Sequence, residues 1–490
     1  MTGAGSAALP AAAPRELFVG GRWRAAEGGG TFAVRDPATD ETLCRVADAT
    51  PADGQAALAA AAAAQEGWAA RPPRERADLL HRAHQALADR TDELALVITL
   101  EMGKPLAEAR AEVGYAAAFL RWYAEETCRI EGSYRVAPAG GARLLTMRQP
   151  VGPCLFVTPW NFPLAMAARK VAPALAAGCT AVLKPAAQTP LSALAFAAVL
   201  ADCGLPDGVV NVIPTSTSAA VTGPLLADRR LRKLSFTGST EVGRALAGTA
   251  GERLLRVSME LGGNAPFLVF PDADLDAAVA GAVVAKLRNG GEACTAANRF
   301  LVHAEVADEF TARLAARFAA LTVGRGTDPG VDVGPLIDDR AVRQVHALVR
   351  EAGQRGARVL TGGAPSGGAG HFYPPTVLAD TPAHARVCHE EIFGPVAPVT
   401  AFADEEEALR LANDTPYGLA SYVYTDRVDR AVRVAERLEA GMVGVNTGLV
   451  SDPAAPFGGV KDSGSGREGG REGIEDYVDV KYVRLALRHG

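Results

Sequence analysis

Residues 154–184 read CLFVTPWNFPLAMAARKVAPALAAGCTAVLK, and this stretch decides the fold class. Short apolar runs at 154–158 and 180–183 have the length of buried strands, and the segment between them, 164–177, has the length of a helix. A strand, a helix and a second strand within about 30 residues form a βαβ unit, in which the two strands lie parallel. The stretch therefore predicts an α/β protein with a parallel sheet.

The same alternation continues toward the C-terminus. Further strand candidates lie at 209–213 and 233–236, and helix candidates at 191–203, 216–227 and 240–249. Such a series predicts a parallel sheet with helices on its faces. Because ligands bind where the strands of these sheets end, we expect functional groups at 158–161, at Lys184 and at 237–239.

The flanking regions have different patterns. Residues 50–130 are Ala-rich and predict two or three helices. After Glu260 a second alternating series predicts a second α/β domain, with strand candidates at 266–270, 300–303, 359–361 and 396–402 and a helix at 275–287. The tail, 477–487, is β-prone, and we expect it to pair with the edge of another subunit.

Composition excludes several classes of protein. The 490 residues allow roughly three domains of about 150 residues, and the 48% hydrophobic and 22% charged residues are typical of a globular chain. The net charge of −6, without runs of like charge, argues against nucleic-acid binding. No apolar stretch reaches the length of about 18 residues that a membrane span needs. Residues 1–14 have no basic segment typical of a secretory signal, and we interpret them as a disordered lead-in.

The seven cysteines are scattered and include no C-x-x-C pair. This pattern argues against a disulfide framework and against a metal site, and it indicates a reducing, cytoplasmic location. Cys294 follows Gly290-Gly291-Glu292-Ala293, where two glycines permit a tight turn and the backbone N–H groups could bind an oxyanion. For a single cysteine, burial as a small hydrophobic side chain is the commoner role. Glu260 precedes a glycine pair at the end of a strand, and the sequence allows it to be either a base or an ion-pair partner.

Two glycine motifs are candidates for phosphate binding. Residues 464–469, GSGREG, match G-x-G-x-x-G only as a string, because the true fingerprint joins a strand to a helix within a βαβ unit. Residues 236–243, FTGSTEVG, do lead from a strand into a helix, whose N–H groups favour an anion. On spacing alone, capping of that helix by Ser239 or Thr240 is the favoured interpretation.

Several segments, in this order and at this spacing, resemble the aldehyde dehydrogenase superfamily. They are Pro159-Trp160-Asn161-Phe162-Pro163, Lys184-Pro185, Phe236-Thr237-Gly238-Ser239, Glu260-Leu261-Gly262-Gly263, Cys294, Glu391-Ile392-Phe393-Gly394-Pro395 and Pro456-Phe457-Gly458-Gly459-Val460-Lys461. Others look like the succinate-semialdehyde dehydrogenase branch: Arg232-Lys233-Leu234-Ser235-Phe236, Ala265-Pro266-Phe267, Ala297-Asn298-Arg299, Gly334-Pro335-Leu336-Ile337 and Gly473-Ile474-Glu475-Asp476-Tyr477. The resemblance covers essentially the whole chain after residue 15.

The resemblance implies a division of the chain. A Rossmann-type, parallel-sheet NAD(P)-binding domain would comprise 15–130 and 151–261, and an α/β catalytic domain would comprise 262–450. A small β oligomerisation element would comprise 131–150 and 474–490, and it implies a homodimer or homotetramer.

The resemblance also implies the chemistry. Cys294 would attack the aldehyde to give a thiohemiacetal, hydride would leave to NAD(P)+, and the thioester would be hydrolysed by water that Glu260 activates. The side-chain amide of Asn161 and the N–H of Cys294 would hold the oxyanion. An acid is then the expected product, rather than the acyl-CoA that branches without the glutamate make.

The implied cofactor is NADP+ or NAD+. Lys184 would bind the adenosine ribose, Ser239 the pyrophosphate and Glu391 the nicotinamide ribose, and the full set of cofactor-binding residues would be Thr158, Trp160, Lys184, Ala187, Gly238, Ser239, Leu261, Glu391 and Phe393. Members that prefer NAD+ commonly carry Glu where this chain has Ala187. Because no carboxylate there repels a 2′-phosphate, we predict that NADP+ is accepted and preferred.

The substrate of that branch, succinate semialdehyde, carries a distal carboxylate. Two arginines and a serine that bind it align with Arg169, Arg288 and Ser451. Alternatively, Arg169 lies on a helix surface and Arg288 forms a salt bridge with an acid at an interface. Glutarate semialdehyde or another aldehyde remains an alternative substrate, and a catalytically silent binding or structural protein is an alternative of another class.

Two positions and one segment depart from the family pattern. Glu292 replaces the usual Gln, and an ionised carboxylate so close to Cys294 would disfavour the thiolate and slow acylation. Ala296 replaces a second cysteine found in close relatives, which removes a local disulfide switch. Residues 452–455, DPAA, differ from the branch at the substrate entrance and leave the identity of the aldehyde open.

Overall fold

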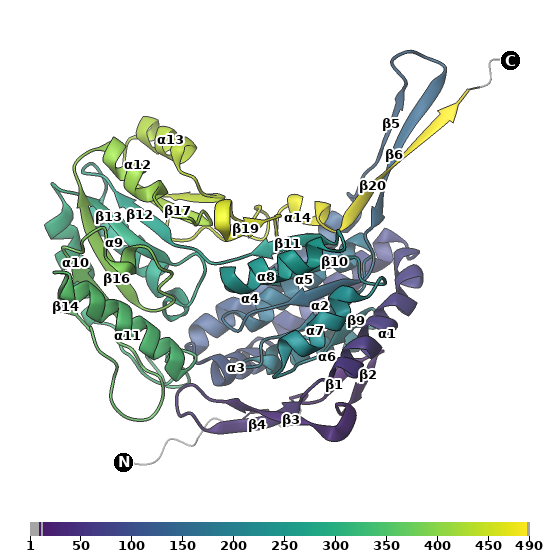
Figure 1. Ribbon diagram of the computed structural model, residues 1–490, viewed down its shortest axis with the longest axis horizontal. Coiled ribbons are helices and arrows are strands. Elements are labelled where there is room, and N and C mark those ends of the chain that lie inside the picture. Colours follow the sequence, from purple (N-terminus) through teal and green to yellow (C-terminus); the bar gives the residue numbers. More distant parts are fainter. Residues whose placement is uncertain (1–8, 11–12, 488–490) are drawn as a thin grey trace.

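The computed structural model describes residues 9–10 and 13–487. Figure 1 shows two α/β lobes side by side and a narrow β arm that projects away from them. Most of the lead-in predicted at 1–14 lies outside the described residues, and Leu9 packs against the core of the first lobe. Within the described part of the chain, no helix is both long and apolar enough to cross a membrane.

The first lobe is built on an eight-stranded sheet with the order β19-β11-β10-β7-β8-β9-β1-β2. The parallel strands are β7 (Cys154–Val157), β8 (Ala181–Lys184), β9 (Val210–Val212), β10 (Lys233–Thr237) and β11 (Arg256–Glu260). Antiparallel edge strands are added by β1 (Leu17–Val19), β2 (Arg22–Arg24) and β19 (Gly464–Ser465). The sequence located four of these five strands and placed Glu260 at the end of a further strand without giving its bounds.

The Gly-rich string at 464–469 has a structural role in this sheet. Its first two residues form β19, which pairs antiparallel with Met259 and Glu260 at the end of β11. The segment follows a short 3-10 helix, η4 (Lys461–Ser463), and does not connect a strand to a helix in a βαβ unit. The structure therefore agrees with its interpretation as a chance match to the dinucleotide fingerprint.

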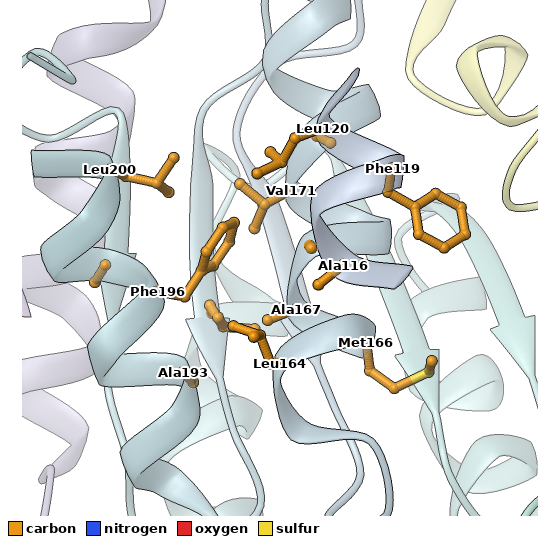
Figure 2. Close-up of a cluster of buried hydrophobic side chains, with 14 of the residues drawn as sticks. Ala116, Phe119, Leu120, Leu164, Met166, Ala167, Val171, Ala193, Phe196 and Leu200 are labelled. Carbon is orange, nitrogen blue, oxygen red and sulfur yellow. The ribbon is translucent and has the colours of Figure 1, made fainter. Parts of the chain in front are cut away.

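Helix α5 (Pro163–Ala177) occupies the centre of the first lobe, and every one of its residues is buried. It begins at a proline, whose missing N–H costs nothing in a first turn, and ends at Gly178, which has a left-handed φ of 92°. Its many alanines let α4 (Leu106–Thr127) and α6 (Pro190–Asp202) approach closely. Figure 2 shows side chains of these three helices, such as Leu120, Val171 and Phe196, in one apolar cluster.

The remaining helices on this sheet are α7 (Ser218–Ala227) and α8 (Thr240–Gly251), as predicted. Between residues 50 and 130, however, the structure has four helices, α1 (Pro51–Ala69), α2 (Pro73–Asp89), α3 (Thr91–Met102) and α4, where the sequence predicted two or three. Only Arg90 separates α2 from α3, and no Gly or Pro marks that boundary. The hairpin β3 (Thr31–Arg35) and β4 (Thr42–Ala47) precedes them.

The second lobe contains a seven-stranded sheet with the order β14-β15-β16-β13-β12-β17-β18. Its strands are β12 (Ala265–Val269), β13 (Ala297–His303), β14 (Arg358–Thr361), β15 (Thr376–Ala379), β16 (Val396–Phe402), β17 (Ala420–Tyr424) and β18 (Met442–Val445). All pairs except β14 with β15 are parallel. Its helices are α9 (Leu275–Leu287), α10 (Ala307–Ala319), α11 (Asp339–Gln354), α12 (Glu405–Asn413) and α13 (Val428–Arg437).

The projecting arm is a three-stranded antiparallel sheet of β5 (Ser133–Val136), β6 (Ala142–Pro150) and β20 (Val478–Ala486), and the short helix α14 (Glu472–Glu475) precedes β20 (Figure 1). The sequence predicts pairing of the tail with another subunit, whereas the structure pairs β20 with β6 of the same chain along its whole length. Tyr134, Val136, Val480 and Tyr482 of this arm are more than half exposed.

Candidate active site

A cavity of about 500 Å³ lies where residues of the two lobes meet. The first lobe contributes the segments that follow β7, β10 and β11, which is the end of the sheet that the sequence predicted. The second lobe contributes the loops around residues 288–295, 337–344 and 389–393. The cavity is thus lined by both halves of the chain.

Most of the predicted site residues line this cavity. These are Trp160, Asn161, Arg169, Gly238, Ser239, Glu260, Leu261, Arg288, Cys294, Glu391, Phe393 and Ser451. Thr158, Lys184 and Ala187 do not line it. Thr158 directly precedes the lining residue Pro159, and its N–H donates to the carbonyl of Lys184 at 3.2 Å. The structure therefore gathers residues from positions 160 to 451 of the chain around one space.

Cys294 is placed by a strained turn. Asn289, Gly290 and Gly291 have φ angles of 59°, 61° and 81°, a left-handed run in which two glycines avoid the cost of a side chain. On the other side, a Cβ added at Gly263 would lie 2.2 Å from the carbonyl oxygen of Cys294. This close approach explains why glycine follows Glu260-Leu261-Gly262.

The thiol of Cys294 is held in its neutral form. Burial raises its pKa to about 12, Glu391 and Glu260 act in the same direction, and Arg169 and Arg288 act against it. A thiol with such a pKa is a poor nucleophile near neutral pH unless a base removes its proton. The site therefore needs a proton acceptor within it.

Glu260, at the end of β11, has the properties of that acceptor. It is 1% exposed, and neither carboxylate oxygen has a hydrogen-bond partner among the described residues. Burial and the nearby Glu468 raise its pKa well above the usual value, whereas Arg169 and Lys170 oppose the shift. A buried, unpaired carboxylate with a raised pKa is a stronger base than a solvated one.

Arg169 is buried, which excludes the alternative of a surface position on its helix. It is 1% exposed, its Nε lies 2.5 Å from Oε2 of Glu468, and its guanidinium lies 4.1 Å from the centre of the Phe457 ring. Lys170 contacts the other oxygen of Glu468 at 2.6 Å. Atom Nη2 of Arg169 is buried without a hydrogen-bond partner among the described residues, so it can donate to a ligand.

Arg288 also lines the cavity and differs from Arg169 in its partners. Its guanidinium lies 4.7 Å from the Phe162 ring and 5.9 Å from the Tyr115 ring. No acid among the described residues forms an ion pair with it. A charged guanidinium that stacks on aromatic rings keeps its in-plane N–H groups available for a carboxylate.

Asn161 connects the two catalytic loops. Its Nδ2 donates to the carbonyl of Glu292 at 2.9 Å, and its Oδ1 accepts from the N–H of Phe162 at 3.1 Å. The amide has a second N–H, and the residue lines the cavity, so this group can donate to an oxyanion.

Glu292 is bound by the backbone and lies outside the lining of the cavity. Its carboxylate accepts from the N–H of Ile337 at 3.0 Å, it does not line the cavity, and burial raises its pKa well above the usual value. Burial thus opposes the negative charge that the expected slowing of acylation requires, and that slowing stays a prediction. Similarly, Asp452 accepts from the N–H of Ala454 at 2.8 Å and does not line the cavity.

The remaining part of the cavity fits a dinucleotide. Ser239 caps α8 through a 3.5 Å bond from the N–H of Val242, as the favoured interpretation predicted, and the capped N-terminus still faces the cavity. The Oγ1 atoms of Thr158 and Thr237 are buried without hydrogen-bond partners among the described residues. Such unpaired donors at the strand ends indicate a place for a polar ligand.

Glu391, Phe393 and Trp160 line the cavity, and Lys184 lies outside its lining. Lys184 donates to Oγ of Ser218 at 2.8 Å, and burial lowers its pKa to about 8. Glu391 accepts from the N–H of Gly263 at 3.0 Å, and burial raises its pKa to about 7. Phe393 and Trp160 form an edge-to-face pair with centres 5.4 Å apart. Within the described ranges, no cluster of three His, Cys, Asp or Glu side chains could hold a metal ion.

The sequence missed several residues that shape the site. Lys104, Glu112 and Asn289 contact the Asn161 loop, and Phe162 and Phe457 form aromatic walls against the two arginines. The one available signal for Lys104 was the Gly103-Lys104-Pro105 break, which predicts only the end of a helix.

Comparison of the chain with known proteins finds a matching family and similar enzymes. A model described as the aldehyde dehydrogenase family matches residues 23–483. Succinate-semialdehyde dehydrogenase of Paenarthrobacter nicotinovorans is 58% identical over 91% of this chain and 99% of the relative. A probable succinate-semialdehyde dehydrogenase [NADP(+)] of Sinorhizobium fredii is 50% identical over 92% of each. Glutarate-semialdehyde dehydrogenase of Pseudomonas aeruginosa is 48% identical over 96% of this chain and 97% of the relative.

A solved structure agrees with the fold. The crystal structure of succinate-semialdehyde dehydrogenase from Burkholderia pseudomallei superposes with a TM-score of 0.96 at 48% identity, and it covers 98% of this chain and 100% of the other. Both parallel sheets and the arm therefore belong to an architecture already observed by experiment.

Proposed function

This chain belongs to the aldehyde dehydrogenase family, and from this premise we propose that it oxidises succinate semialdehyde to succinate with NADP+ or NAD+. The predicted family and the aldehyde dehydrogenase-like α/β fold are confirmed. One observation carries the proposal: the Cys294 thiol and the unpaired Glu260 carboxylate line the same cavity as Arg288, which has no acidic partner among the described residues.

Cys294 is the proposed nucleophile. Its sulfur adds to the aldehyde carbon, and its proton passes to Glu260, whose raised pKa suits it to accept a proton from a thiol of high pKa. The oxyanion of the thiohemiacetal accepts hydrogen bonds from the amide of Asn161 and the N–H of Cys294. The bound dinucleotide supplies a hydride acceptor.

Glu260 has a second task in the proposal. Glu260 first releases the thiol proton to solvent and becomes a carboxylate again. Water then attacks the Cys294 thioester that remains after hydride loss, and the Glu260 carboxylate removes a proton from that water. Sulfur is a good leaving group, so the acid is released and the thiol is restored. Two functions for one carboxylate are consistent with its position, because both of its oxygens lack partners among the described residues.

The distal carboxylate of the substrate is assigned to Arg288, Arg169 and Ser451, all of which line the cavity. Arg288 supplies a guanidinium that has no acidic partner in the described chain. Arg169 supplies its buried Nη2, which has no hydrogen-bond partner among the described residues. Charge-assisted bonds from arginine favour an aldehyde with a carboxylate over a neutral aldehyde. Glutarate semialdehyde, one methylene longer, is the second candidate, because a relative of nearly equal similarity is named for it.

NADP+ is the proposed preferred cofactor. Thr158, Trp160, Lys184, Ala187, Gly238, Ser239, Leu261, Glu391 and Phe393 would hold the dinucleotide. Ala187 is only partly buried and carries no charge that opposes a 2′-phosphate, and the ammonium of Lys184 is nearby in sequence and bound to Ser218. The name of a relative at 50% identity, which specifies NADP(+), supports the same preference.

The organisation of the chain follows from these assignments. We assign dinucleotide binding to 15–130 and 151–261, catalysis to 262–450, and oligomerisation to 131–150 and 474–490. Exposed apolar side chains on the arm, such as Tyr134 and Tyr482, support a homodimer or homotetramer. The free state of all seven cysteines in the structure is consistent with a cytoplasmic location.

A panel of aldehydes tests the function. Reduced, freshly purified protein is assayed for NADPH and NADH formation with succinate semialdehyde, glutarate semialdehyde and the neutral butanal. We expect the highest kcat/KM with succinate semialdehyde and NADP+. Binding of cofactor without oxidation of any aldehyde would instead identify a catalytically silent member of the family.

A further inference from the structure

Lys104 and Glu112 form a buried ion pair next to the site that the proposed chemistry does not use. Lys104 lies in the turn between α3 and α4, Glu112 lies on α4, and their side chains are 1% and 0% exposed. The Nζ and Oε2 atoms are 2.6 Å apart. Burial of two charges costs about as much as their attraction returns, so a gain in stability does not by itself explain the pair.

The second hydrogen bond of Lys104 leads to the candidate oxyanion site. Its Nζ donates to the backbone carbonyl of Asn161 at 2.8 Å and lies 4.0 Å from the centre of the Phe162 ring. The ammonium thus contacts two consecutive residues of the loop between β7 and α5. These two contacts fix the position of the peptide group that carries the Asn161 side chain.

The other oxygen of Glu112 binds the start of α5. Oε1 accepts from the N–H groups of Leu164 and Ala165, at 3.0 and 3.2 Å. These are first-turn N–H groups that have no partner within the helix, and a negative charge is favourable there. One turn further along α4, Ala116 belongs to the apolar cluster with Leu164 of α5 (Figure 2). The carboxylate therefore fixes the other end of the same loop.

The loop that carries Cys294 is attached to the same elements. Nδ2 of Asn289 donates to the carbonyls of Asn161 and Glu292, at 3.1 and 2.9 Å. The N–H of Asn289 donates to Oε2 of Glu108, also on α4, at 2.8 Å. Through these contacts α4 and the preceding turn fix the relative position of the Asn161 amide and the Cys294 loop.

We propose that Lys104 and Glu112 are positioning residues that hold the Asn161 amide where the oxyanion on a Cys294 adduct forms. The inference rests on the proposed acyl chemistry at Cys294. Neither side chain lines the cavity, so they act through Asn161 rather than on the substrate. Hydrogen-bond donors stabilise an oxyanion only when they are held within about 0.5 Å of the productive position.

Lys104→Met tests this role, and Lys233→Met is its matched control. Lys233 is also fully buried, donates to Oγ of Ser258 and lies 4.9 Å from the centre of the Tyr477 ring. Unlike Lys104, its ammonium makes no hydrogen bond to the Asn161 loop within the described chain. We expect Lys104→Met to lower kcat and kcat/KM for the aldehyde equally, by about 10- to 100-fold, because the lost interaction exists in the transition state. The KM for cofactor should stay unchanged, and Lys233→Met should retain kcat.

Two further reactions at Cys294 separate positioning from general damage. Alkylation by iodoacetamide forms no oxyanion, so its rate should be the same in Lys104→Met and in the wild type. Hydrolysis of p-nitrophenyl acetate without cofactor passes through a tetrahedral oxyanion, so Lys104→Met should slow it as much as aldehyde oxidation. If the wild type hydrolyses the ester but oxidises no aldehyde, the proposed function fails while the ester comparison still decides the role of Lys104.

Three other results would contradict the positioning role of Lys104. Equal losses in Lys104→Met and Lys233→Met, or a parallel loss of alkylation, would overturn the positioning role, and so would a wild type that performs neither acyl reaction. If Lys104→Met does not fold, Glu112→Gln replaces it, since it keeps the shape and one acceptor oxygen. It should show the same selective loss of ester hydrolysis relative to alkylation, and an unchanged ratio would reject the proposal.

Discussion

Arg169 of α5 and Glu468, almost 300 residues later, form an ion pair inside the protein, with 2.5 Å between Nε and Oε2. Lys170 contacts the second oxygen of the same carboxylate, at 2.6 Å, and the negative charge of Glu468 helps to raise the pKa of Glu260. The pair thus connects the stability of the first lobe with the proton affinity of the proposed base.

Glu468→Gln should destabilise the fold by about 3–5 kcal/mol, because it leaves two buried cations without a counter-charge. Arg169 and Lys170 hold the pKa of Glu468 below its unfolded value. A carboxyl group whose pKa is lower in the folded protein stabilises the fold above its unfolded pKa of about 4.3. This stabilisation is lost as the pH falls from there toward the folded pKa. Thermal unfolding of wild type and variant between pH 7 and pH 3 should therefore show a difference that shrinks with falling pH. A constant difference would contradict the linkage.

Glu260→Gln should prevent release of the acid. Without a base, the thioester on Cys294 persists, so kcat should fall by about 10²- to 10⁴-fold while cofactor binding remains. Because the thiol proton also passes to Glu260 in the proposed mechanism, rapid mixing should show a slowed first turnover of NADPH as well. A first turnover at the wild-type rate, followed by a stop, would show that another group accepts the thiol proton and that Glu260 serves only hydrolysis.

The pH profile of the wild type reports the same group. Because burial and Glu468 raise the pKa of Glu260, the carboxylate needed for hydrolysis forms only as pH rises through that elevated value. The kcat should accordingly increase with pH across the range above the ordinary carboxyl pKa. The residual kcat of Glu260→Gln should not show this increase with pH. If the increase persists in the variant, a group other than Glu260 causes it.

Arg288→Met should change substrate choice more than catalysis. The variant keeps an unbranched side chain against Phe162 but loses the guanidinium, so kcat/KM for succinate semialdehyde should fall by about 10- to 100-fold, equivalent to about 1.5–3 kcal/mol for a charged hydrogen bond. The neutral butanal should be little affected. Equal losses for both aldehydes would reject a carboxylate role. Arg169→Met is less decisive, since it also removes the partner of Glu468.

Ala187→Glu should move cofactor preference toward NAD+. A carboxylate at this position would repel the 2′-phosphate and accept bonds from ribose hydroxyls instead. The ratio of kcat/KM for NADP+ to that for NAD+ should fall by about tenfold or more, which corresponds to about 1.4 kcal/mol. An exposed substitution such as Ala320→Glu provides a control of equal charge. An unchanged ratio would place the 2′-phosphate elsewhere.

Local patterns in the sequence determined the architecture. Alternation of short apolar runs with helix-length segments specified four of the five parallel strands of the first sheet, because burial on both faces of a strand requires a continuous apolar run. Glycines marked close backbone approaches: a side chain at Gly263 would clash with the carbonyl of Cys294, and one at Gly291 would clash with the carbonyl of Gly394. The boundary at Arg90 was lost, since no Gly or Pro marks it.

The tertiary structure alone decided which side chains are partners. The sequence did not indicate that Glu468 binds Arg169, that Lys104 binds the carbonyl of Asn161, or that the tail pairs with β6 of its own chain. The physical reason is that apolar periodicity records which face of an element is buried, whereas the charge states of Glu260 and Cys294 depend on groups brought together from distant parts of the chain. The motif residues were thus identifiable from the sequence, and their proton affinities only from the fold.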